Sequence, residues 1–171
     1  MLKVYIEEET IRKRVREIAE DISKEIGNRE VVFIANLKGA VIFFSDIIRN
    51  IKSSNVLVDF IATESYKGKE TTGEIKILKD ISLNIAGKEV VIFEDILDTG
   101  LTLNTIISYI KEVHKPSLIK VVVFLDKPSR RIVNLKVDYI GFEIIEDVFV
   151  VGYGMDCDEK YRNLPYIAVL E

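Results

Sequence analysis

The hydrophobic positions near the beginning of the chain recur at the spacing of an α-helix. Thr10 is a suitable N-cap before this pattern, and Gly27 is a suitable residue to end it. The pattern therefore predicts a helix with one buried face. The residues of that face are Ile11, Val15, Ile18, Ala19, Ile22 and Ile26.

Short apolar runs rich in β-branched residues follow, and polar segments separate them. Such runs are typical of strands that are buried on both faces. They predict strands at residues 31–35, 56–63, 88–93 and 118–125, with shorter strand-like segments at 137–142, 148–152 and 166–170. Helices are predicted at about residues 40–51 and 101–113.

The alternation of strands and helices predicts an α/β fold with a mainly parallel central sheet flanked by helices. In such a sheet, ligands bind beyond the carboxyl ends of the strands. Three predicted buried strands run into polar segments, at residues 36–39, 94–100 and 126–131. We therefore expect these three segments to form the functional site together, at one edge of the sheet.

Length, charge and cysteine content narrow the class of protein. A chain of 171 residues without a low-complexity linker suits a single domain, residues 1–171. A net charge of −4 argues against a general nucleic-acid binder, and the apolar runs are too short to cross a membrane. The absence of a signal-peptide pattern and the single cysteine, Cys157, favour the cytoplasm.

The most informative segment is residues 90–103, where a hydrophobic strand runs into carboxylates and then into a helix. Asp98, Thr99, Gly100, Leu101 and Thr102 would place backbone amides and two hydroxyls at the beginning of that helix. Such a helix N-terminus binds a phosphate group, and a glycine lets the backbone approach it closely.

The adjacent pair Glu94 and Asp95 suits either sugar hydroxyls or a magnesium ion. An alternative is that Asp98 only caps the helix and that the acidic pair is a solvated turn. Three carboxylates within five residues repel one another, however, unless a cation or ligand offsets their charge. The segment therefore favours a pocket for a ribose 5-phosphate.

This segment resembles the phosphoribosyl pyrophosphate motif of the type I phosphoribosyltransferases, and the rest of the chain resembles their hypoxanthine-guanine branch. The resemblance implies the fold of that family, with a small hood formed by the terminal segments, including about residues 140–171. It implies that Asp98 is the general acid/base and that Glu94 and Asp95 contact ribose and Mg²⁺.

The same resemblance assigns residues outside the motif. Leu37-Lys38-Gly39 resembles the pyrophosphate-binding loop, which often holds an unusual peptide conformation, and Arg162 resembles a further pyrophosphate contact. The residues that the resemblance places around the purine are Lys127, Phe149, Val150 and Asp156, with Asp156 also near a second Mg²⁺. Ser65 and Tyr66 resemble part of a closing lid, at about residues 65–74.

Several of these residues also have a purely structural interpretation. Lys38 could be a surface lysine, and an aromatic residue in an apolar run, such as Phe149, is more often part of the core. Arg130 and Arg131 are expected to serve structure or an interface, and the lone His114 is given no chemistry. Met155, beside Asp156, departs from the leucine of the family pattern.

The resemblance implies transfer of a phosphoribosyl group to hypoxanthine or guanine, by a homodimer or homotetramer whose partners are small-molecule substrates. Two alternatives remain open. One is an enzyme for another base, such as xanthine. The other is a regulator that senses phosphoribosyl pyrophosphate while binding nucleic acid, which the acidic composition disfavours. The preference among hypoxanthine, guanine and xanthine is not determined by these residues.

Overall fold

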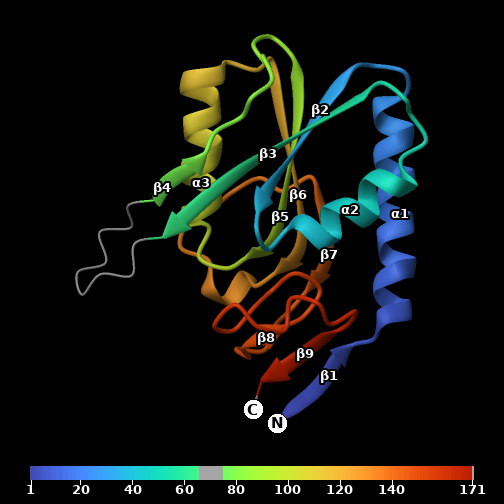
Figure 1. The fold of residues 1–171 in the computed structure, drawn as a ribbon, viewed down its shortest axis with the longest axis vertical. Coiled ribbons are helices and arrows are strands. Elements are labelled where there is room, and N and C mark those ends of the chain that lie inside the picture. Colours follow the sequence, from blue (N-terminus) through green and yellow to red (C-terminus); the bar gives the residue numbers. More distant parts are fainter. Residues whose placement is uncertain (66–74, 171) are drawn as a thin grey trace.

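The computed structural model describes residues 1–65 and 75–170 and has an α/β architecture (Figure 1). The strands are β1 (Leu2–Ile6), β2 (Val31–Leu37), β3 (Val56–Ser65), β4 (Ile75–Lys79), β5 (Glu89–Leu97), β6 (Leu118–Asp126), β7 (Tyr139–Glu143), β8 (Val150–Val151) and β9 (Ile167–Leu170). The helices are α1 (Glu8–Ile26), α2 (Val41–Asn50) and α3 (Leu101–Tyr109), followed by a π-helical turn, η1 (Ile110–His114), and a short 3₁₀ turn, η2 (Pro128–Arg130).

The central sheet has the strand order β4-β3-β2-β5-β6-β7. The pairs β3–β2, β2–β5, β5–β6 and β6–β7 are parallel, and only the edge strand β4 is antiparallel to its neighbour. The prediction of a mainly parallel sheet is therefore confirmed. The long central strands are almost wholly buried, as their continuous apolar runs require.

Each face of this sheet has its own hydrophobic core, because successive residues of a strand point to opposite faces. Phe33 and Phe93 pack with the buried face of α1 and with α2, whereas Ile34 and Ile92 pack with Leu103 and the rest of α3. Figure 1 shows α1 and α2 on the opposite side of the sheet from α3. The two layers of helices hold the sheet in place and leave its carboxyl edge free for chemistry.

A smaller antiparallel sheet, with the order β1-β9-β8, lies beyond that edge and brings the two chain termini side by side (Figure 1). This sheet and residues 144–170 form the expected hood over the carboxyl ends of the central strands. The hood begins later than residue 140, because β7 pairs in parallel with β6 and belongs to the central sheet.

Three further details differ from the sequence-based expectation. Helix α1 begins at Glu8, so Thr10 lies inside the helix and does not cap it. Strands β1 and β4 were not predicted, because their side chains are largely exposed and show no buried apolar run. The last turn of the predicted helix over residues 101–113 is π-helical from Ile110.

Candidate active site

The three polar segments singled out in the sequence meet at the carboxyl edge of the central sheet. They follow β2, β5 and β6, which are neighbours in the sheet, and Leu97 at the end of β5 lies opposite Asp126 at the end of β6. The backbone amide of Lys127 donates to the carbonyl of Leu97 at 2.9 Å, which ties the second and third segments together. The expected common site is therefore present.

The segment after β5 forms a turn that opens on the beginning of α3. Gly100 has φ of +86°, a left-handed conformation that favours glycine, and a Cβ there would lie 3.0 Å from the carbonyl oxygen of Val133. The first amides of a helix have no acceptor within the helix, so they are available to an anion. This turn borders a cavity of about 430 Å³.

The residues lining this first cavity include most of those expected to bind ribose phosphate. They are Asn36, Gly39, Thr63, Glu94, Asp95, Ile96, Leu97, Asp98, Thr99, Gly100, Thr102, Leu103, Asp156 and Arg162. Leu101 is the one residue of the expected phosphate turn that does not line it, and its side chain is exposed. Thr63 was not anticipated, because it ends a predicted strand and belongs to no motif by itself. Asn36 belongs to the expected segment 36–39 but was given no role of its own.

Glu94 and Asp95 line this cavity, Glu94 buried and Asp95 partly buried. The side-chain amide of Asn36 donates to both carboxylate oxygens of Glu94, and the hydroxyl of Thr63 donates to Asn36 Oδ1 at 3.2 Å. Burial raises the pKa of Glu94 well above its usual range, and the neighbouring charge of Asp95 adds to this effect. Burial also raises the pKa of Asp95. Two such carboxylates are suited to a cationic partner.

The loop after β2 packs directly against this acidic pair. The peptide bond between Leu37 and Lys38 is cis, in agreement with the unusual peptide conformation that was expected. A Cβ at Gly39 would overlap Asp95 Oδ2, and a Cβ at Gly154 would overlap the carbonyl oxygen of Gly39. The backbone of this loop is therefore enclosed between Asp95 and the hood, and only glycine fits at residues 39 and 154.

Two of the expected pyrophosphate contacts, Lys38 of this loop and Arg162 of the hood, are paired with carboxylates of the hood. Lys38 Nζ lies 2.9 Å from Glu159 Oε2, and its side chain lines neither cavity. Arg162 lines the first cavity, and its Nη2 lies 2.8 Å from Asp156 Oδ1. Both cations are thus close to the site and paired with Asp156 or Glu159.

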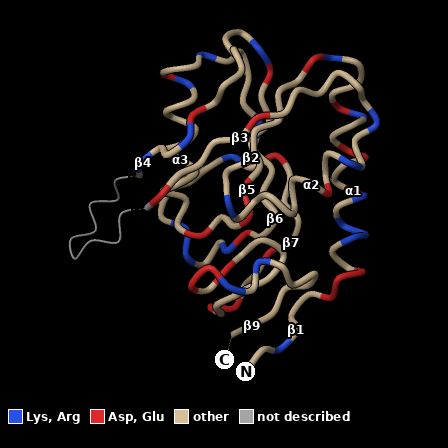
Figure 2. Tube along the Cα trace, viewed as in Figure 1, with Lys and Arg blue, Asp and Glu red and all other residues tan. Residues whose placement is uncertain are grey.

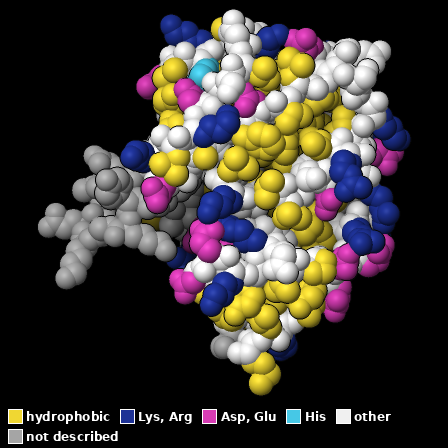
Figure 3. Space-filling model, in the orientation of Figure 1, with side chains coloured by type: hydrophobic (Ala, Val, Ile, Leu, Met, Phe, Trp, Pro, Cys, Tyr) yellow, Lys and Arg dark blue, Asp and Glu magenta, His cyan; other side chains and the backbone are white. Residues whose placement is uncertain are grey.

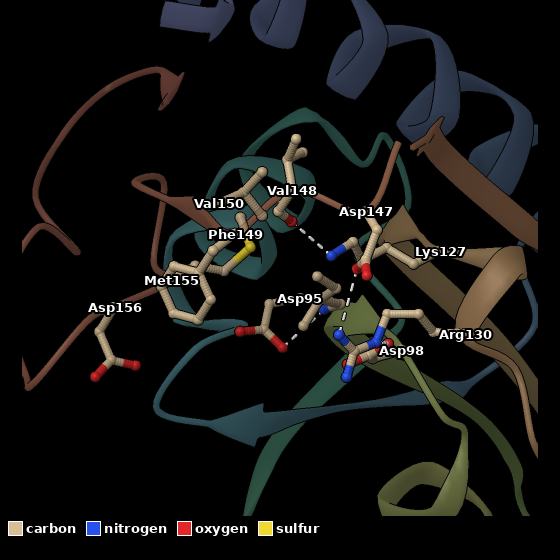
Figure 4. A pocket seen from close by; sticks show the side chains of 11 residues that line it. Asp95, Asp98, Lys127, Arg130, Asp147, Val148, Phe149, Val150, Met155 and Asp156 are labelled. Atoms are coloured by element: carbon tan, nitrogen blue, oxygen red, sulfur yellow. Dashed lines mark hydrogen bonds and ion pairs between the residues drawn. The ribbon is translucent and has the colours of Figure 1, made fainter. Parts of the chain in front are cut away.

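A second cavity, of about 460 Å³, adjoins the first and contains the residues expected to surround a purine (Figure 4). Its lining consists of Asp95, Ile96, Asp98, Lys127, Arg130, Asp147, Val148, Phe149, Val150, Met155 and Asp156. Phe149 is 55% exposed, so it is not a core residue, and its ring faces this cavity. Buried Lys127 donates from Nζ to the carbonyl of Val148 at 2.6 Å.

Asp98 lines both cavities and therefore lies where their contents would meet. Arg130 Nε is 2.8 Å from Asp98 Oδ1, so Arg130 lies at the site, contrary to the expectation that it serves only structure or an interface. Arg131 does have a structural role, since it donates to the carbonyl of Asp98 and pairs with Asp126. The sequence could not separate these two neighbouring arginines, which point in different directions.

Most of the expected lid lies outside the residues that the structure describes. Ser65 ends β3, and Tyr66 with the rest of the expected lid, to residue 74, lies outside the described residues. Among residues 1–65 and 75–170, no three His, Cys, Asp or Glu side chains are grouped closely enough to hold a metal ion, so Asp156 does not join Glu94 and Asp95 in one cluster. In the same ranges, no helix combines the length and apolar character that crossing a membrane requires.

Comparison with known proteins identifies the family of the chain. Residues 5–160 match the model of the phosphoribosyl transferase domain family. The hypoxanthine-guanine phosphoribosyltransferases of Bacillus subtilis and Aquifex aeolicus are 43% and 44% identical, over 99% of this chain and over 93% and 95% of theirs. A crystal structure of a hypoxanthine-guanine phosphoribosyltransferase from Bacillus anthracis superposes with a TM-score of 0.93, at 47% identity and over the whole of both chains. These matches show that the chain belongs to the phosphoribosyltransferase family.

Proposed function

We propose that this protein transfers the 5-phosphoribosyl group of phosphoribosyl pyrophosphate to hypoxanthine, guanine or both, which yields IMP or GMP and pyrophosphate. This reaction serves purine salvage. The observation that carries the proposal is the meeting of two cavities at Asp98, one with a phosphate-binding helix N-terminus and one with Lys127 and Phe149. The relatives named above carry the same activity in their names.

The hydrogen-bonding and charged groups in and beside the first cavity suit the donor, phosphoribosyl pyrophosphate. The amides and hydroxyls at the beginning of α3 bind the 5-phosphate, and Glu94 with Asp95 accepts hydrogen bonds from the ribose hydroxyls. Lys38 and Arg162 bind the pyrophosphate once they leave Glu159 and Asp156. Their charges stabilise the departing pyrophosphate as its negative charge grows in the transition state.

The acceptor fits the second cavity. The ring of Phe149 stacks on the purine, Val150 contacts it through the backbone, and Lys127 donates to the exocyclic 6-oxygen. Asp156 lies near the far edge of the base. These contacts hold purine N9 in line with C1 of the ribose, which lowers the entropic part of the barrier.

The reaction then proceeds by one displacement. The bond between C1 and the pyrophosphate oxygen breaks, the bond between N9 and C1 forms, and the N7 proton of the purine moves to the carboxylate of Asp98. A positioned base of this kind contributes about 10²- to 10⁴-fold. Asp95, Asp98 and Asp156 all border both cavities, and the resemblance of residues 90–103 to the family motif assigns the role of base to Asp98.

We propose Mg²⁺ as the cofactor. Two buried carboxylates with raised pKa values form a donor set of hard oxygen atoms that a divalent cation would stabilise. Glu94 and Asp95 would hold the ion, and Asp156 would contribute to a second one, with donor oxygens and water as the remaining ligands. When bound, the metal supplies charge neutralisation for the pyrophosphate.

The broader setting is also proposed. Residues 1–171 act as one catalytic domain, and the protein acts in the cytoplasm. It assembles as a homodimer or homotetramer. Hydrophobic side chains gather over the face that carries β3 and α2 (Figure 3). Ile42 of α2 and Val58 of β3 are among the exposed hydrophobic residues of these two elements. Lys and Arg are interspersed with Asp and Glu along the chain (Figure 2), which supports small-molecule substrates and not nucleic acid as partners. Sedimentation equilibrium determines the assembly.

The test is an assay of the purified protein with phosphoribosyl pyrophosphate, Mg²⁺ and, in turn, hypoxanthine, guanine, xanthine and adenine. We expect nucleotide and pyrophosphate in equal amounts with hypoxanthine, guanine or both. Turnover with xanthine or adenine alone would indicate the enzyme for another base. Binding of the donor without turnover of any base would indicate the sensor.

A further inference from the structure

Arg130 bridges two carboxylates at the wall of the purine cavity (Figure 4). It ends the short turn η2 after β6, and its Nε lies 2.8 Å from Asp98 Oδ1 while its Nη1 donates to Asp147 Oδ1 at 3.3 Å. The charge of Asp98 is the largest cause of the raised pKa of Arg130, with Asp147 next. The guanidinium is therefore directed at the carboxylate that the reaction uses.

The two oxygens of Asp98 are in different surroundings. Oδ1 is enclosed by the protein and accepts no hydrogen bond of good geometry from any described residue, although Arg130 lies at ion-pair distance. The side chain as a whole is 37% exposed, and Oδ1 contributes almost nothing to that exposed area. Arg130 is the cation beside the enclosed oxygen.

We propose that Arg130 is a positioning residue for Asp98. It holds Oδ1 against the wall of the cavity and thereby directs Oδ2 at the purine proton. This inference rests on the proposed function, since it gives Arg130 its effect through the carboxylate that takes that proton. Arg130 is not assigned a contact with the base, and Asp147 serves only to orient the guanidinium from its exposed side.

A positioning role has a kinetic signature that a purine contact lacks. An Asp98 side chain that swings away from the reacting proton slows the chemical step without weakening the binding of either substrate. Loss of a purine contact would instead raise the KM for the base. Two residues that act as one unit also show strongly non-additive effects, so removing Arg130 should matter little once Asp98 is gone.

The experiment measures kcat and the KM values for hypoxanthine and for the donor, each substrate varied with the other at saturation, for wild type, R130M, R130K, D147N, D98N and the double variant D98N/R130M. For R130M we expect kcat to fall by about 10- to 10²-fold, with both KM values within about threefold of wild type. R130K keeps the charge without the planar fork, so its loss should be about 3- to 10-fold. D147N removes the outer contact of Arg130, so it should lower kcat by less than R130K does. In the D98N background, R130M should cost no more than about twofold further.

The following results would overturn the inference. An R130M variant with unchanged kcat and a raised KM for hypoxanthine would make Arg130 a purine contact. Full additivity of R130M and D98N would show that Arg130 acts independently of Asp98. If R130M melts below the assay temperature, R130K decides, and wild-type kcat in that variant contradicts the inference. Wild type that turns over no purine contradicts the proposed function itself, whereas active wild type with an equally active R130M contradicts this inference alone.

Discussion

The side-chain amide of Asn36 lies 3.0 Å from Oε2 and 3.3 Å from Oε1 of Glu94, so one neutral donor serves both oxygens of a buried carboxylate. A neutral donor compensates a buried charge only in part, and burial accordingly raises the pKa of Glu94 well above its usual range. The charged form of Glu94 is therefore unfavourable in the ligand-free site, and a bound cation would stabilise it.

This relationship predicts how the stability of the ligand-free protein depends on pH. Because the folded-state pKa of Glu94 is above the unfolded value, the folded protein binds more protons than the unfolded chain between these two values. The contribution of Glu94 to stability is then fully present below the ordinary glutamate pKa of about 4.3 and is lost as pH rises through the folded-state pKa. Without divalent metal, E94Q should therefore be more stable than wild type at pH 8.

Urea denaturation of wild type and E94Q between pH 4 and pH 8 measures this difference. The exposed Glu143, at the end of β7, provides the control, and E143Q should follow wild type across the range. A stability difference between E94Q and wild type that does not change with pH would contradict the prediction. E94Q should also bind phosphoribosyl pyrophosphate more weakly, since the amide is a poor ligand for ribose hydroxyls together with Mg²⁺.

Gly39 is predicted to be intolerant of even a methyl group. In G39A the new Cβ overlaps Asp95 Oδ2, so either the loop or Asp95 has to move, at a cost of about 1–3 kcal/mol of stability. We expect donor affinity, measured by calorimetry, to fall by about tenfold or more. Gly87 is the control, because it has φ of +71° and a Cβ added there would meet no atom within 4 Å. G87A should lose some stability and no donor affinity.

Lys127 is predicted to determine affinity for the base and not for the donor. Its ammonium group is buried in the wall of the purine cavity, and a charged hydrogen bond to the 6-oxygen contributes about 1.5–3 kcal/mol. K127M should therefore raise the KM for hypoxanthine by about 10- to 10²-fold and leave the KM for the donor within about threefold. K136M, which changes an exposed lysine, should leave both values unchanged. Equal increases in both KM values for K127M would contradict this assignment.

The sequence predicted the features that depend on local pattern. The buried strands, the face of α1 and the turn that ends in Gly100 follow from periodicity and from residue types with narrow conformational preferences. The resemblance of residues 90–103 to a known motif then located the first cavity.

The features that were missed depend on contacts between distant segments. Strand β1 pairs with β9 from the other end of the chain, and the residues Leu2–Ile6 alone do not indicate that pairing. Gly154 is required because the hood rests on the carbonyl of Gly39, more than a hundred residues earlier. The sequence does not distinguish Arg130 from its neighbour Arg131. In the structure, Arg130 ends the turn η2 and lies beside Asp98. Side-chain direction in irregular segments is set by tertiary packing, which single-residue patterns do not contain.

The central claim, that Asp98 takes up the purine proton where the two cavities meet, is tested most directly by D98N. Asn has the same shape and caps a turn about as well as Asp, but its amide does not accept the proton. We predict that D98N melts within a few degrees of wild type, binds the donor with similar affinity and shows kcat lower by about 10²- to 10⁴-fold, or about 3–5 kcal/mol of barrier. Nearly full turnover in a stable D98N protein, measured with hypoxanthine at saturating donor, would contradict the account and leave Asp98 with a structural role.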